Sequence, residues 1–109
     1  MKGTIKELLK APGVQGYVII RPKGIQIKLP AKYRVTDAKK RLRNFYDGLM
    51  DRDDLPGNIL ELYTDNMVIV SCISRNTMLM VFSSRTTNMA ILRMTGKLVL
   101  ANIIKEKDK

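Results

Sequence analysis

The side chains that most often perform catalysis or hold metal ions are scarce in this sequence of 109 residues. It contains no histidine, which removes the commonest general base and metal ligand. Its single cysteine, Cys72, has no second cysteine with which to form an internal disulfide or a zinc site. Because Cys72 lies in an apolar strand pattern, we expect a small buried thiol. The sequence therefore predicts a protein that is not an enzyme and that carries no cofactor or metal.

Two short motifs resemble binding loops but lack the residues that such loops need. The first is an acidic cluster of Asp51, Asp53 and Asp54. It lacks the spacing and the glycine of a calcium-binding loop, and the solvated end of a helix explains it better. The second is RMTGK at residues 93–97, which has no leading glycine and falls in the middle of an expected helix. We therefore expect the chain to bind neither calcium nor a nucleotide.

The charge of the chain is unusual, with 20 Lys and Arg against 10 Asp and Glu, a net charge of +10. Nine of the basic residues fall between positions 21 and 43, with Asp37 as the only acid there. They are Arg21, Lys23, Lys28, Lys32, Arg34, Lys39, Lys40, Arg41 and Arg43. Such an excess favours an anionic partner, which could be nucleic acid, an acidic protein face or anionic lipid. Solvated positions on an edge strand and a helix explain it equally well.

The element that must position this charge is an amphipathic helix expected over residues 36–54. Thr36 and Asp37 are its expected N-cap pair, and Leu55, Pro56 and Gly57 break the pattern after it. Its apolar stripe consists of Ala38, Leu42, Phe45, Tyr46, Leu49 and Met50. Its opposite side consists of Lys40, Arg43, Asn44, Asp47 and Asp51. We expect the apolar stripe to dock on a sheet.

The remaining elements predict a single domain over residues 1–109, in the order α-β-β-α-β-β-β-α. A short helix is expected at 4–10, strands at 14–21, 25–29, 58–64, 67–73 and 77–83, and a last helix from Thr86 or Thr87 to about Glu106. The apolar positions of this last helix include Ala90, Ile91, Met94, Leu98, Ala101 and Ile104, and Gly96 is either a weak point or a close-packing point. The second and third strands alternate and should be edges, whereas the others are apolar through much of their length. This predicts an α+β sandwich with a five-stranded antiparallel sheet of order 2-1-5-4-3, the middle helix on one face and the terminal helices on the other.

This pattern resembles the Roadblock domain family, which includes the Roadblock-type dynein light chains, bacterial gliding-motility GTPase regulators and scaffold subunits of the Ragulator complex. The resemblance covers nearly the whole chain. Its opening is carried by Leu8, Leu9, Pro12, Gly13, Val14 and Gly16. The entry to the last helix is carried by Asn88, Met89 and Leu92, although Ala90 stands where the family often has glycine. The strongly basic middle of the chain is not a family trait.

The resemblance implies a dimer, either a homodimer or a pair with a paralogous subunit. The third strands would pair edge to edge, and the middle helices would lie antiparallel beside one another. The implied interface consists of Arg41, Asn44, Gly48, Ile59, Glu61 and Tyr63. The implied partner-binding residues are Lys39, Lys40, Arg43 and Asp47.

Three functions remain open from the sequence. The first is a dimeric cytoplasmic platform that binds and regulates a small Ras-like GTPase, or scaffolds a complex that contains one. The second is a nucleic-acid-binding module that uses the basic stretch, with only Tyr33 and Tyr46 near enough to stack on bases. The third is a structural adaptor subunit of the dynein type. None of them requires a membrane-spanning segment, and we expect none.

Overall fold

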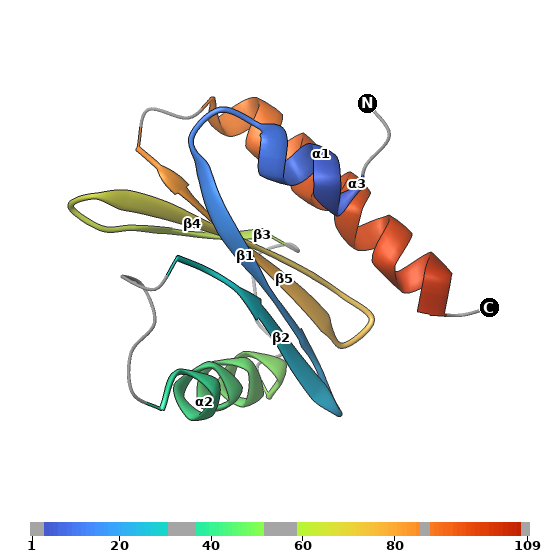
Figure 1. Cartoon of the computed structure of the whole chain (residues 1–109). Helices are drawn as coiled ribbons and strands as arrows, with labels where there is room; N and C mark the ends of the chain where they lie inside the picture. Colours follow the sequence, from blue (N-terminus) through green and yellow to red (C-terminus); the bar gives the residue numbers. More distant parts are fainter. Residues whose placement is uncertain (1–3, 31–36, 52–58, 86–87, 108–109) are drawn as a thin grey trace.

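A computed structural model describes residues 4–30, 37–51, 59–85 and 88–107, and shows one antiparallel sheet between two layers of helix (Figure 1). The elements are α1 (Ile5–Lys10), β1 (Val14–Arg21), β2 (Gly24–Lys28), α2 (Ala38–Met50), β3 (Ile59–Tyr63), β4 (Met67–Ser74), β5 (Thr77–Ser84) and α3 (Met89–Lys107). The five strands are ordered β2-β1-β5-β4-β3, and every neighbouring pair is antiparallel. Both the element order and the strand order predicted from the sequence are therefore confirmed.

The sheet has an apolar core on each face, because its central strands alternate between two sets of buried side chains. On β1, Tyr17 and Ile19 belong to the core beneath α1 and α3, whereas Val18 and Ile20 belong to the core beneath α2. Figure 1 shows α2 on one side of the sheet and α1 with α3 on the other. The predicted division of helices between the two faces is confirmed.

The turn between β4 and β5 fixes the register of these two strands. Its central residues, Arg75 and Asn76, have φ values of 49° and 63°. A two-residue turn with both residues at positive φ matches the right-handed twist of a hairpin. The Tyr46 hydroxyl of α2 donates a hydrogen bond to the Asn76 carbonyl oxygen. The same turn therefore both joins the strands and holds α2 against the sheet.

Helix α2 begins after Asp37, which occupies the N-cap position as predicted. Its backbone has φ 62° and ψ 27°, and its side chain accepts no hydrogen bond from the helix. An N-cap residue normally has an extended backbone, which lets its side chain reach the exposed N–H groups. The left-handed backbone of Asp37 therefore accounts for the missing side-chain cap. Thr36 and residues 52–54 of the predicted helix lie outside the described residues.

Helix α3 is capped by Asn88, whose Oδ1 accepts hydrogen bonds from the N–H groups of Ala90 (3.0 Å) and Ile91 (3.2 Å). Thr86 and Thr87, the predicted caps, lie outside the described residues. The side of α3 that packs on the sheet consists of Leu92, Thr95, Gly96, Val99, Leu100 and Ile103. Of the six apolar positions expected from the sequence, none is fully buried and only Ile104 is half-buried. Periodicity did not identify the buried side because α3 is apolar on more than one side.

Gly96 is a close-packing point between α3 and β4. A Cβ atom at this position would lie 3.0 Å from the Sγ atom of Cys72. Cys72 is buried, as the sequence predicted, and burial raises the pKa of its thiol to about 11. The thiol is therefore an unreactive packing group, and its sulfur occupies the space into which a larger residue at position 96 would extend.

The contact predicts that Gly96→Ala and Cys72→Ala are energetically coupled. In an otherwise unchanged chain, Gly96→Ala should fail to give the gain of about 1 kcal/mol that alanine brings over glycine in a helix, because the new methyl group presses on Sγ. In a Cys72→Ala background the gain should appear. Urea unfolding of the two single variants and the double variant measures this coupling. Additive effects would show that the sulfur does not limit the approach of α3.

Candidate protein-interaction surface

The outward side of α2 is a polar strip. It is exposed because the opposite side of the helix is buried against the sheet. Tyr46 and Leu49 are buried in the core under α2, and Leu42, Phe45 and Met50 pack against the same core. With 3.6 residues per turn, the opposite side must then face outward. Its exposed residues are Lys40, Arg41, Asn44, Asp47, Gly48 and Asp51. We call this set the α2 outer strip.

Gly48 has no visible role within the chain. A Cβ atom added there would meet nothing within 4 Å. A glycine in an exposed helix interior lowers helix stability by about 0.5–1 kcal/mol relative to alanine. Nothing in the described part of the chain requires this cost. Arg41 and Asn44 lie on the same flank, so the predicted helix-contact residues form one continuous surface.

The four predicted partner-binding residues do not share one environment. Lys39, Lys40 and Asp47 are exposed. Arg43 is half-buried, its Nη2 donates to the Gly24 carbonyl oxygen at 3.3 Å, and its guanidinium carbon lies 5.2 Å from the centre of the Tyr46 ring. A cation in this position interacts favourably with the aromatic face. Arg43 therefore fastens α2 to the first residue of β2.

The basic residues of the middle region are dispersed over the molecule. Arg21 ends β1, Lys23 lies in the following turn and Lys28 ends β2, whereas Lys39 lies on α2. Tyr46 is buried and bonded to the β4–β5 turn, and desolvation by burial raises its pKa. Its ring is therefore not open for stacking on a base, and Tyr33 lies outside the described residues. The described cations do not form the single stripe that binding to a nucleic-acid backbone would use.

The two edges of the sheet differ in how they are protected. The β2 edge carries Lys28, is followed by Pro30 and is held at its start by Arg43. The β3 edge carries neither lysine nor proline, and Leu62 and Tyr63 are 37% and 57% exposed. In the part of the chain that the structure describes, no strand pairs with the outer side of β3. An edge of this kind is a ready template for pairing with another chain.

The α3-facing side of β3 carries a charged contact. Arg93 of α3 forms an ion pair with Glu61, in which its Nε donates to Oε2 and its Nη2 donates to Oε1 at 3.1 Å. The Tyr63 hydroxyl also donates to Oε1 of Glu61, at 3.0 Å. The hydrogen bond from Arg93 is the main cause that lowers the pKa of Glu61. Two of the predicted interface residues, Glu61 and Tyr63, are thus linked to each other and to α3.

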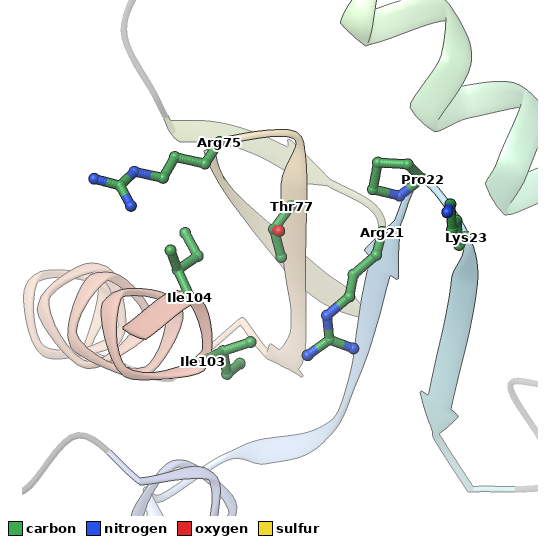
Figure 2. Close-up of a pocket in the computed structure, with 7 residues that line it drawn as sticks. All are labelled: Arg21, Pro22, Lys23, Arg75, Thr77, Ile103 and Ile104. Carbon is green, nitrogen blue, oxygen red and sulfur yellow. The ribbon is translucent and has the colours of Figure 1, made fainter. Parts of the chain in front are cut away.

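Two further features were not singled out from the sequence. The first is an exposed apolar row on α3, where Ile91, Met94 and Leu98 are 43%, 50% and 40% exposed. Their spacing of three and four residues is visible in the sequence, where it predicts the side of the helix that packs on the sheet. In the structure these residues are exposed instead. The second is a cavity at the C-terminal end of α3 that is lined by Arg21, Lys23 and Arg75 (Figure 2). Arg75 is far from Arg21 and Lys23 in the sequence, so only the fold shows that all three line one cavity.

Two kinds of feature are missing from the described residues. No group of three or more His, Cys, Asp and Glu side chains there is placed to hold a metal ion. None of the helices that the structure describes is both long and apolar enough to span a bilayer.

A comparison with solved structures identifies the fold. The chain superimposes on the crystal structure of a Roadblock/LC7 domain from Streptomyces avermitilis with a TM-score of 0.69 and 12% sequence identity, over 100% of this chain and 98% of that one. No family model matches the sequence, and no curated protein matches it either. The resemblance inferred from the sequence is therefore confirmed at the level of the fold.

The Glu61–Arg93 pair predicts a dependence of stability on pH. Because the pKa of Glu61 is lowered in the folded chain, the pair stabilises the fold above the ordinary glutamate pKa of 4.5, and this contribution is lost as the pH falls through the lowered value. Glu61→Gln should therefore lower the free energy of unfolding near pH 7, and the deficit should shrink below pH 4.5. Urea unfolding across this range measures it. Asp65→Asn, at an exposed turn, is the control, and a deficit that does not vary with pH would contradict the assignment.

Proposed function

We propose that the protein is a non-catalytic dimeric platform whose protomers pair through β3 and α2. The observation that carries this proposal is the difference between the two sheet edges. One edge has Lys28 and Pro30 and is held by Arg43, whereas β3 has neither lysine nor proline and presents Leu62 and Tyr63 to solvent. Natural proteins protect the edge strands that must remain unpaired. We therefore infer that the unprotected β3 edge pairs with another strand.

A second copy of the chain fits this edge better than an unrelated strand does. Antiparallel pairing of β3 with its own copy places a two-fold axis perpendicular to the sheet. Such an axis keeps both copies of α2 on the same side of the continuous sheet. The outer strips can then meet, and Gly48 permits a close approach between the helices, with Arg41 and Asn44 beside it. This accounts for an exposed helical glycine for which the described part of the chain shows no requirement.

The paired helices would form the docking surface for another protein. Lys39 and Lys40 are exposed cations on α2, and Asp47 is an acid within the α2 outer strip. Charges at the rim of an interface mainly raise the association rate and fix the orientation of the partner. A small Ras-like GTPase, or a complex that contains one, is the partner that the resemblance favours. The platform acts by binding, because the chain brings no catalytic group of its own to this surface.

The dimer is tested by Gly48→Leu. Because the space around Gly48 is open within one chain, the variant should keep its circular dichroism spectrum and gain helix propensity. At the proposed helix contact the leucine side chain should block the approach and shift the protein to monomer. Light scattering after size-exclusion chromatography at micromolar concentration measures this, since a buried interface of about 1,600 Å² should leave little free monomer.

Ala90→Leu, at an exposed position of α3, is the matched control and should remain dimeric. Leu62→Lys is a second variant, which adds a charge to the β3 edge and should also favour monomer. An unchanged chain that is already monomeric under these conditions would overturn the proposed assembly.

Partner docking is tested by reversing two charges that hold no described contact. Lys39→Glu with Lys40→Glu should slow association with a small Ras-like GTPase about tenfold or more, because the steering field changes sign. Purified GTPases from the same genome, loaded with GDP or a non-hydrolysable GTP analogue, are measured by biolayer interferometry. Lys6→Glu with Lys10→Glu on α1 is the control of equal charge. Duplex DNA binding that falls steeply with salt would favour the nucleic-acid function instead.

A further inference from the structure

A cavity lies between the C-terminal part of α3, the β1–β2 turn and the β4–β5 turn, and its lining includes both basic and apolar residues. It has a volume of about 280 Å³ and is lined by Arg21, Pro22, Lys23, Arg75, Thr77, Ile103 and Ile104. Figure 2 shows the Arg21 and Arg75 side chains on either side of Thr77, with Ile103 and Ile104 projecting from α3. Among the described residues that line it, none is acidic.

The fold explains why these residues meet. Along β1, the side chains that face α3 are Tyr17 and Ile19, and the next in the same row is Arg21. The apolar core under α3 therefore ends in a charged residue at the β1–β2 turn. Arg75 reaches the same place from the β4–β5 turn, and the last turns of α3 close the cavity with two isoleucines.

Arg21 is the residue of this cavity that has an unused donor. Its Nε is buried and has no hydrogen-bond partner in the part of the chain that the structure describes. A second hollow, of about 390 Å³, adjoins through the shared residues Arg75 and Ile104 and adds Lys105, and its described lining includes no acid. Cations gathered in a concave site focus the local field and raise the concentration of anions there.

We propose that this cavity binds a small organic anion, a phosphate monoester or a carboxylate attached to an apolar group. The Arg21 guanidinium binds the anionic oxygens, and Lys23 and Arg75 add positive charge around them. The apolar part of the ligand packs on Ile103, Ile104 and Pro22. The site lies on the α3 side of the sheet, so it does not depend on the proposed dimer or on docking at α2.

The size of the cavity limits the ligand. Ligand pockets usually measure about 300–1,000 Å³, so a site of about 280 Å³ takes a compact molecule. Phenyl phosphate, which joins one ring to one phosphate group, is a suitable probe. Inorganic phosphate tests the charge alone, and benzyl alcohol tests the apolar wall alone.

The experiment is a titration of the isotope-labelled full chain followed by amide NMR shifts. Phenyl phosphate should bind more tightly than inorganic phosphate and benzyl alcohol, and the shifts should centre on Thr77, Ile103 and their neighbours. Arg21→Met removes the guanidinium but keeps a long apolar side chain, and should weaken binding of phenyl phosphate tenfold or more. Lys28→Met, which removes one exposed cation from β2 outside the cavity, should leave the affinity unchanged.

Lys23→Met, at an exposed turn position, should also weaken binding of phenyl phosphate. It keeps the site testable in case Arg21→Met disturbs the fold. Equal loss in the Arg21→Met and Lys28→Met variants would show a general effect of net charge and would overturn the site. Equal affinity for benzyl alcohol and phenyl phosphate would likewise overturn it, because the cations would then contribute nothing.

Discussion

The constraint on which the structure depends is that the inner strands of the sheet must be covered on both faces. β5 is buried at seven of its eight residues, and β1 is buried on both sides through its second half. Such strands cannot face water, so each face needs a helical layer. With α1 and α3 on one face and α2 on the other, none of the described helices covers a sheet edge. Each edge strand must therefore either carry residues that prevent pairing or pair with another chain.

Tyr46 and Arg43 show how a single helix serves both the core and the surface. Tyr46 directs its ring into the core and its hydroxyl to the β4–β5 turn, and Arg43 lies over that ring and reaches the start of β2. These contacts tie α2 to the β1–β2 and β4–β5 hairpins. The helix is thus held at two points, and the residues opposite its buried side face outward from it. A surface held in this way loses little conformational freedom when a partner binds.

The sequence predicted the parts of the fold that depend on local patterns. Strict alternation in β2 and continuous apolar character in β4 and β5 were enough to order the sheet. The parts that it did not predict depend on contacts between distant residues. The half-buried position of Arg43 depends on its contact with Gly24, which lies 19 residues earlier in the sequence. For α3, apolar residues on several sides left the buried side undetermined until the sheet was present. The candidate surface on α2 was predicted as a strip, but the separate environment of each cation was not.

Two groups of cations lie on opposite faces of the sheet and contribute separately to the net charge of +10. Lys39 and Lys40 lie on α2, whereas Arg21 and Arg75 lie at the cavity beside α3. At physiological salt, charges separated by more than about 8 Å of solvent are largely screened from one another. The sheet and its two cores also separate these groups, so each cluster acts on its own surroundings. Arg21, Lys39 and Lys40 fall in one basic stretch of the sequence because β1, β2 and α2 follow each other in the chain, whereas Arg75 lies outside that stretch. Their placement in the fold instead predicts that reversing the charge of one cluster leaves binding at the other intact.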